Sequence, residues 1–246
     1  MRDDFAARAY EYEKKSAWVA DDIVCGHAIN LLATKSTHLG NILDAGGGTG
    51  ILASSIASVL PSHSVTVMDI SAAMLAKVPK EFKKVHCSIE SVRTLDKQFD
   101  TILLRQVLHY LADPSNAINE LFSVLSPNGV LYVGQIVVPD NESALWLQHV
   151  AEQISPNRRR VWQLTKLISL FLSTGMKLDG ASIHPFRDTL NTWMQRSTVR
   201  LDWQHVFQKA ATSITHTVKK TLGIEERAGD ILFEVLFCHA IFSRRQ

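Results

Sequence analysis

The alternation of two kinds of segment between residues 41 and 138 constrains the fold of this chain more than any other feature. Short runs rich in branched apolar side chains are separated by longer stretches whose apolar residues recur at helical spacing. Strands that alternate with helices in this way form a mostly parallel sheet, because each crossover helix returns the chain to the same edge. The expected strands cover 41–45, 64–68, 84–88, 99–104 and 129–138, and the expected helices cover 50–60, 72–78 and 114–125.

The flanking segments are expected to add helices and a final strand. Helices are expected within 5–33, over 143–154 and over 160–173, whereas 181–223 has a mixed pattern and 231–243 is apolar enough for a central strand. We therefore predict a doubly wound α/β sheet organised as a single domain. Its parts are a helical flap (1–38), a ligand-binding core (39–140) and a C-terminal half (141–246) with a helical insertion before the last strand.

Composition excludes several classes of protein. Of the 246 residues, 46% are hydrophobic and 20% are charged, and 26 basic against 24 acidic side chains leave a formal charge of +2. This excludes a disordered chain and provides no basic stripe for nucleic acid. The densest basic run, residues 158–160, is most simply a solvated helix start, although one of its arginines could bind an acidic acceptor. No nucleic-acid partner is expected.

Targeting signals and metal motifs are also not expected. No apolar run approaches the roughly 18 residues that span a bilayer, and the first segment carries acidic residues where a targeting peptide would avoid them. Cys25, Cys87 and Cys238 have no paired spacing, and the histidines show no HxH or HxxxH pattern with carboxylates. We expect a cytoplasmic protein without a metal or a membrane partner, and the sequence leaves its oligomeric state open.

The strongest local motif is the sequence ILDAGGGTG at residues 42–50, which joins an apolar strand to a helix. Glycines are needed where the backbone takes positive φ or where a ligand approaches the chain closely. A second apolar strand follows and ends in Asp69, where an acid can hydrogen-bond the hydroxyls of a ribose. Together these two signals predict a nucleotide-type ligand site.

The spacing of the glycines separates two cofactors. The dinucleotide fingerprint GxGxxG would need a third glycine where Ile51 stands, whereas GxGxG fits Gly46, Gly48 and Gly50. A nicotinamide dehydrogenase is therefore disfavoured.

At this point the sequence resembles the class I S-adenosylmethionine-dependent methyltransferases. The resemblance lies in ILDAGGGTG, in VTVMDIS around Asp69, in FDTILL (99–104), in LHYL (108–111) and in LSPNGVL (125–131). It covers 41–138 closely. The remainder, including GASIHPFRDTLNTWMQR, is loosely similar to the small-molecule branch that includes quinone-biosynthesis C-methyltransferases. The resemblance implies a Rossmann-like fold and S-adenosylmethionine as the cofactor, with S-adenosylhomocysteine as the product.

The resemblance also assigns cofactor-binding positions. It places the glycine loop against the methionine portion, Asp44 beside the amino group and Asp69 on the ribose. Ser88 stands where the family usually has an acid that binds adenine, and Glu90 could substitute for it. The complete set of cofactor-binding candidates is Asp44, Gly46, Gly47, Gly48, Gly50, Asp69, Ile70, Ser88, Ile89, Arg105 and Gln106.

Candidates for catalysis and acceptor binding each have a structural alternative. His109 follows the fourth strand and could be a general base, or a histidine that packs or caps a helix start. Tyr10 and Tyr12 could close over the acceptor or pack beneath it. Trp193 could line the acceptor site or belong to the core.

We therefore interpret the chain as an enzyme that transfers a methyl group to a small organic acceptor by in-line displacement. Alignment and exclusion of water dominate such catalysis, so no metal or covalent enzyme intermediate is required. The alternatives are an RNA or protein methyltransferase and a noncatalytic relative that acts as a scaffold or regulatory subunit. The acceptor atom, the pathway and the need for a base or a partner are left open.

Overall fold

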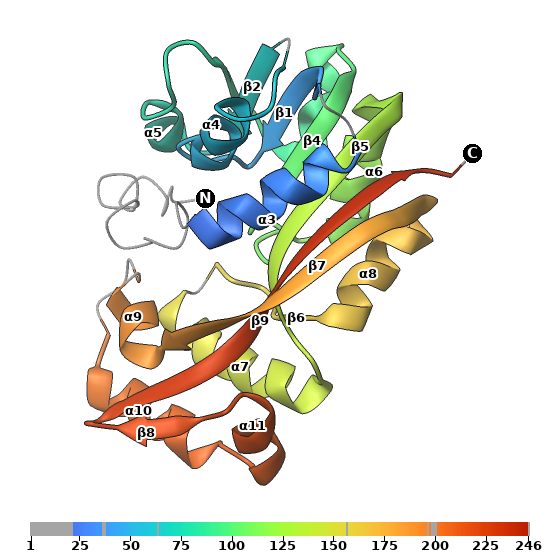
Figure 1. Cartoon of the computed structure of the whole chain (residues 1–246). Helices are drawn as coiled ribbons and strands as arrows, with labels where there is room; N and C mark the ends of the chain where they lie inside the picture. Colours follow the sequence, from blue (N-terminus) through green and yellow to red (C-terminus); the bar gives the residue numbers. More distant parts are fainter. Residues whose placement is uncertain are drawn as a thin grey trace.

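The computed structural model describes residues 22–35, 38–62, 64–155, 157–195, 197 and 201–245. In these parts of the chain, nine strands form one sheet in the order β3-β2-β1-β4-β5-β9-β7, with β6 paired to β5 and β8 paired to β9 (Figure 1). The strands are β1 (Asn41–Ala45), β2 (Ser64–Asp69), β3 (Lys83–His86), β4 (Phe99–Arg105), β5 (Leu125–Val138), β6 (Trp162–Gln163), β7 (Met176–Thr189), β8 (Glu225–Arg227) and β9 (Asp230–Arg244).

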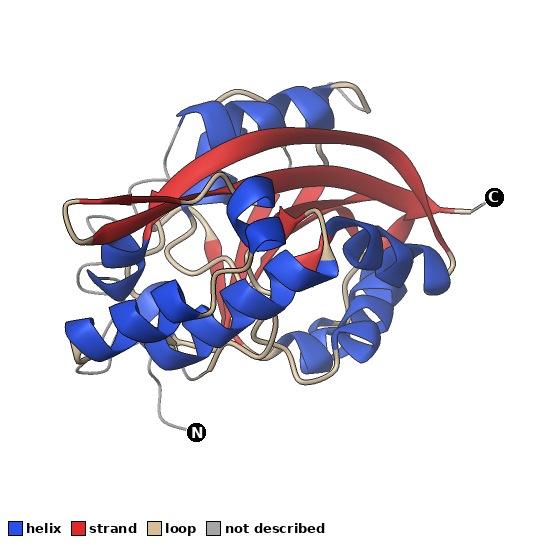
Figure 2. Cartoon of the chain, turned by 90° about the horizontal axis from the view of Figure 1, so that it is seen from below, coloured by secondary structure: helices blue, strands red, loops and turns tan. Residues whose placement is uncertain are grey.

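Helices cover both faces of the sheet, as Figure 2 shows. They are α3 (Asp22–Ala33), α4 (Ile51–Ala57), α5 (Ala72–Leu75), α6 (Pro114–Val124), α7 (Asn141–Ile154), α8 (Leu164–Ser173), α9 (Leu190–Gln195), α10 (Trp203–Thr212), α11 (His216–Thr221) and the 3₁₀ helix η2 (Ile89–Leu95). Among the described residues, none of these helices combines the length and apolar character needed to cross a bilayer.

The predicted parallel core is confirmed. Strands β3, β2, β1, β4 and β5 pair in parallel, with Asp44 in register with Val67 of β2 and with Leu103 of β4. The final strand is central as predicted, because β9 pairs antiparallel with β5 on one side and with β7 on the other. Helices α9, α10 and α11 form the predicted helical segment before that final pairing.

Strand β5 begins at Leu125 rather than at residue 129, and two expectations for the C-terminal half are also wrong. Residues 181–189 belong to β7, a long strand rather than a mixed segment. Gly180 and Pro185 interrupt the strand pattern in the sequence, but β7 lies at the edge of the sheet, where glycine and proline are tolerated. Helix α8 begins at Leu164 rather than at Arg160, because the chain first forms the short strand β6.

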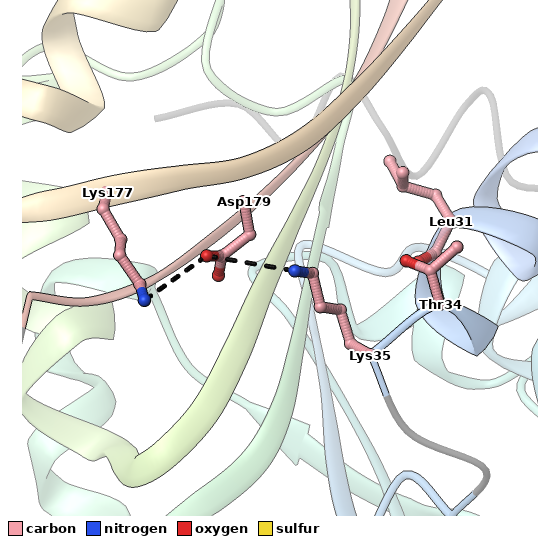
Figure 3. Close-up of polar contacts among 5 residues, drawn as sticks. All are labelled: Leu31, Thr34, Lys35, Lys177 and Asp179. Atoms are coloured by element: carbon pink, nitrogen blue, oxygen red, sulfur yellow. Dashed lines mark hydrogen bonds and ion pairs between the residues drawn. The ribbon is translucent and has the colours of Figure 1, made fainter.

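Helix α3 packs on the antiparallel part of the sheet. Its buried residues include Ala28 and Leu32, and its C-terminal end approaches β7 (Figure 3). There the Asp179 carboxylate lies 3.9 Å from Lys35 Nζ and 3.6 Å from Lys177 Nζ. Ion pairs of this partly exposed kind contribute little, so apolar burial does most to hold α3 in place.

Three histidines from α3, β7 and β9 stack where the helix meets the sheet. The ring centroid of His27 lies 4.5 Å from that of His184 and 5.2 Å from that of His239. His239 is fully buried, and its Nδ1 lies 2.7 Å from the hydroxyl of Tyr132. Burial raises the pKa of Tyr132, so the hydroxyl keeps its proton and donates to a neutral His239.

Acid should weaken this region of the fold. Burial lowers the pKa of His239 from 6.5 to about 3, and the charges of His184, His27 and Arg105 act in the same direction. Below pH 6.5 the unfolded chain therefore protonates His239, whereas the folded chain leaves it neutral down to about pH 3. The contribution of His239 to stability is fully present above pH 6.5 and is lost as the pH falls. Between pH 7.5 and pH 5, His239 alone should lower the free energy of unfolding by about 2 kcal/mol.

Urea denaturation of wild type and His239→Gln at these two pH values measures this contribution. The variant should lose less stability on acidification, since its side chain does not titrate. His205→Gln, at an exposed position of α10, is the matched control and should follow wild type. An equal loss in all three proteins would show that the buried histidine is not responsible.

Candidate functional site

The predicted ligand loop lies where β1, β2 and β4 end. Gly46, Gly48 and Gly50 have φ values of +68°, +58° and +79°, a left-handed conformation that glycine adopts without strain. The amides of Gly46 and Gly47 donate to the carbonyl of Met68 at 2.7 and 3.1 Å. The loop is therefore tied to β2 before α4 begins at Ile51.

Space opens over one residue of this loop. A Cβ built on Gly47 would lie 2.5 Å from Asp44 Cγ, and a Cβ on Gly46 would lie 2.6 Å from Val107 Cγ2. A Cβ on Gly48 would meet no described atom within 4 Å. Gly47 and Gly46 thus serve close packing, whereas Gly48 leaves room for a ligand against the backbone.

Asp44 contributes a buried carboxylate directly beneath the loop. It is 2% exposed, and its Oδ2 has no hydrogen-bond partner among the described residues. Burial raises the pKa of Asp44 to about 6, although the charge of Arg105 opposes the shift. A buried carboxylate oxygen without a partner fits the ammonium group of S-adenosylmethionine, which would supply both charge and hydrogen bonds.

Asp69 connects the second strand to the glycine loop. Its Oδ2 accepts from the amide of Gly48 at 2.8 Å, and its Oδ1 accepts from the amide of Ser71 at 2.8 Å. Each carboxylate oxygen can accept more than one hydrogen bond, so these contacts are compatible with a ribose hydroxyl. Ser71 caps α5, since its hydroxyl accepts from the amide of Met74.

The candidate adenine residues lie beside Asp69. The amide of Cys87 donates to the Asp69 carbonyl at 3.1 Å, which brings the turn containing Ser88 next to the end of β2. Ile70 is 53% exposed, an unusual position for a large apolar side chain, whereas Ile89 is buried. The hydroxyl of Ser88 donates to that of Ser91 at 3.3 Å, and the adenine contacts stay predictions.

The end of β4 lies against the glycine loop through Val107. Arg105 donates from Nη1 to Cys25 Sγ at 3.8 Å. Gln106 has a φ of +56°, and its amide donates to the carbonyl of Gly134 at 2.8 Å. Both residues are cofactor-binding candidates, and their contacts with a cofactor stay predictions.

His109 lies in a turn and is 4% exposed. Its Nδ1 lies 3.2 Å from the side-chain nitrogen of Gln135, which also donates to Gln106 Oε1 at 3.3 Å. Because an amide nitrogen only donates, this contact is a hydrogen bond in the tautomer of His109 that carries its proton on Nε2. The role of His109 as a base stays a prediction, and it would require Gln135 to release Nδ1.

Gln135 is the residue that the sequence analysis missed. It is 1% exposed near the C-terminal end of β5, where its neighbours along the strand are apolar. The sequence does contain a signal for this residue, since it is a polar side chain within an apolar run. A buried amide needs hydrogen-bond partners, so such a residue is a candidate for a polar site.

The arginine run at 158–160 does not start a helix. Arg159 donates from Nε to the carbonyl of Tyr110, and Arg160 donates to the carbonyls of Leu111 and Ala112. The backbone amide of Arg159 also donates to the carbonyl of His109 at 2.8 Å. The predicted helix start is therefore wrong, although Arg159 is exposed as expected of a solvated residue, and these contacts hold the turn that carries His109.

The remaining candidates are the three acceptor-lining residues. Tyr10 and Tyr12 lie outside the described residues. Trp193 is 6% exposed, packs edge-on against Phe233 and donates from Nε1 to Asp188 Oδ2 at 2.7 Å, as expected of a core residue; its contact with an acceptor stays a prediction. Within the described ranges, no cluster of three or more His, Cys, Asp or Glu side chains could hold a metal ion.

Sequence comparisons identify two kinds of relative. Over 100 residues the chain is 40% identical to the tRNA 5-carboxymethoxyuridine methyltransferase of Escherichia coli K12, with 37% of this chain and 38% of that protein covered. Over 132 residues it is 28% identical to the demethylmenaquinone methyltransferase of Chlamydia trachomatis, with 52% and 56% covered. The chain therefore spans well under two thirds of the length of these curated relatives.

Structure and family comparisons agree on the fold. The BH2331 protein of Bacillus halodurans superposes with a TM-score of 0.78 at 16% identity, covering 89% of this chain and 97% of that one. A family model described as a methyltransferase domain matches residues 20–196, which is more than half of the chain. The resemblance that begins in the glycine loop is thus confirmed, and this chain belongs to the methyltransferase-domain family.

Proposed function

We propose that this protein transfers a methyl group from S-adenosylmethionine to a small organic acceptor. The observation that carries the proposal is the pairing of an open backbone position at Gly48 with the buried, unpartnered carboxylate oxygen of Asp44. A loop that only joined a strand to a helix would not need both features.

Each part of the site has a role in this proposal. When bound, S-adenosylmethionine supplies an electrophilic methyl group on a positively charged sulfur. Asp44 binds the ammonium group, Gly48 lets the methionine portion approach the backbone, and Asp69 accepts hydrogen bonds from the ribose. The exposed apolar side chain of Ile70 packs against the adenine.

A tRNA nucleoside is the second candidate acceptor, because the Escherichia coli relative acts on tRNA. Recognition of RNA normally requires a basic surface. The basic and acidic side chains of this chain are nearly balanced, 26 against 24, and its densest basic run is only three residues long. We therefore favour a small acceptor.

Calorimetric titration tests the donor site, and a transfer assay then separates the acceptors. The protein should bind S-adenosylmethionine and S-adenosylhomocysteine with micromolar affinity and should not bind NAD. Incubation with methyl-labelled S-adenosylmethionine should then label a small-molecule extract rather than bulk tRNA. Labelled tRNA would move the acceptor to the second candidate, and no binding of either cofactor form would refute the proposal.

Asp69→Ala should weaken binding of S-adenosylhomocysteine by about 1 to 3 kcal/mol, because a charged hydrogen-bond partner of the ribose is removed. The same change also frees the amide of Gly48, so the thermal midpoint must be measured beside the affinity. Asp96→Ala, beyond η2, is the control and should bind as wild type. Unchanged affinity in folded Asp69→Ala would remove Asp69 from the cofactor site.

A further inference from the structure

We propose that the side-chain amides of Gln106 and Gln135 form the recognition site for a neutral hydroxyl or amide group of the methyl acceptor. The inference rests on the methyl transfer proposed above and specifies the chemistry of its acceptor. It concerns buried polar atoms that have no hydrogen-bond partner among the described residues.

The two amides touch each other and leave two atoms unused. Gln135 Nε2 lies 3.3 Å from Gln106 Oε1, 3.2 Å from His109 Nδ1 and 3.2 Å from the carbonyl oxygen of Ile136. Gln106 Nε2 and Gln135 Oε1 are buried and have no hydrogen-bond partner among the described residues. Buried polar atoms normally have hydrogen-bond partners, so these two are available to a group that binds here.

The orientation of each amide follows from its neighbours. The carbonyl of Ile136 can only accept, so the atom of Gln135 that faces it is the nitrogen. Gln106 must then present its oxygen to that nitrogen, because two amide nitrogens would repel each other. The remaining pair is one donor on Gln106 and one acceptor on Gln135.

One donor beside one acceptor selects among ligand groups. A hydroxyl or an amide can accept from Gln106 Nε2 and donate to Gln135 Oε1 at the same time. A carboxylate only accepts, so its negative charge would lie against Gln135 Oε1, which also only accepts. An ammonium only donates, so it would lie against Gln106 Nε2, which also only donates. A site built to hydrogen-bond one kind of group rejects analogues that leave its buried polar atoms unpaired.

The pair is also placed beside the donor site. Gln106 immediately precedes Val107. The side chain of Val107 lies so close to Gly46 of the glycine loop that a Cβ on Gly46 would clash with it. Gln135 lies in β5 one residue after Gly134, which is in register with Arg105 of β4. Ligands of open α/β sheets bind at this carboxyl edge, so a group held by the two amides would lie next to the methionine end of the cofactor.

The test uses three probes with one aromatic ring each: benzamide, phenol and benzoate. Wild-type protein saturated with S-adenosylhomocysteine should bind benzamide and phenol at least about tenfold more tightly than benzoate. Gln106→Glu should weaken benzamide by about tenfold, since a carboxylate replaces the donor, and Gln135→Met should weaken phenol and benzamide alike. Gln208→Glu, at an exposed position of α10, is the matched control and should keep the wild-type preference.

Affinity for S-adenosylhomocysteine distinguishes the two levels of failure. If wild type does not bind it, the proposed methyl transfer fails. If wild type binds S-adenosylhomocysteine, three results would overturn only the acceptor inference. The complex could bind benzoate as tightly as benzamide, or bind neither neutral probe at millimolar concentration. The third result is that both glutamine variants keep the wild-type preference. The thermal midpoint of each variant, measured without ligand, shows whether it is folded.

Discussion

Asp44→Asn is expected to bind S-adenosylmethionine more than tenfold less tightly than wild type and yet to be the more stable protein. The buried carboxylate is the charged partner of the ammonium group, and losing a charged hydrogen bond costs about 1.5 to 3 kcal/mol. Without the cofactor, the same carboxylate is desolvated and has an unpartnered oxygen. Asparagine keeps the shape and removes the buried charge.

The gain in stability should depend on pH. Burial raises the pKa of Asp44 from 3.8 to about 6, so the folded chain holds this proton more tightly than the unfolded chain. The contribution of Asp44 to stability is therefore fully present below pH 3.8 and is lost as the pH rises through about 6. At pH 8 the cost of the ionised carboxylate is about 3 kcal/mol at most, and Asp44→Asn should recover much of it.

Urea denaturation without cofactor at pH 4 and pH 8, together with calorimetric titration, measures both effects. Asp179→Asn, at the ion pair between α3 and β7, is the control and should change neither cofactor affinity nor the pH dependence appreciably. Wild-type affinity in Asp44→Asn would place the ammonium elsewhere. Equal stability at pH 8 would mean that other groups compensate the buried charge.

Gly48→Val is expected to abolish detectable cofactor binding. The valine side chain would enter the space over Gly48, where a Cβ meets no described atom and where the methionine portion is proposed to lie. The φ of +58° also suits valine poorly, so the variant should lose about 1 to 3 kcal/mol of stability.

Gly175→Val separates these two effects. Gly175 follows α8, has a φ of +86° and likewise has no described atom near its added Cβ, but it is not part of the glycine loop. Both variants should therefore lose similar stability, while only Gly48→Val should lose binding of S-adenosylhomocysteine. Retained binding in folded Gly48→Val would show that no ligand approaches the loop there.

The sequence alone determined the parts of this protein that depend on local pattern. The glycine loop could be recognised because its conformation requires particular residues at adjacent positions, whatever the rest of the chain does. Asp69 could be placed because parallel strands bring their carboxyl ends to one edge, and the structure shows its carboxylate on the amide of Gly48. Alternation of strands and helices was likewise sufficient for β1 to β5 and for the central position of β9.

Tertiary structure decided the features that depend on neighbours distant in the chain. Strand β7 contains Gly180 and Pro185, and only its place at the sheet edge makes that sequence a strand. Arg159 and Arg160 look solvated in the sequence, but the fold brings them to the carbonyls of the turn beside His109. The amide pair of Gln106 and Gln135 and the histidine stack arise in the same way, because burial and hydrogen bonding are properties of packing between strands and helices, and no local pattern encodes them.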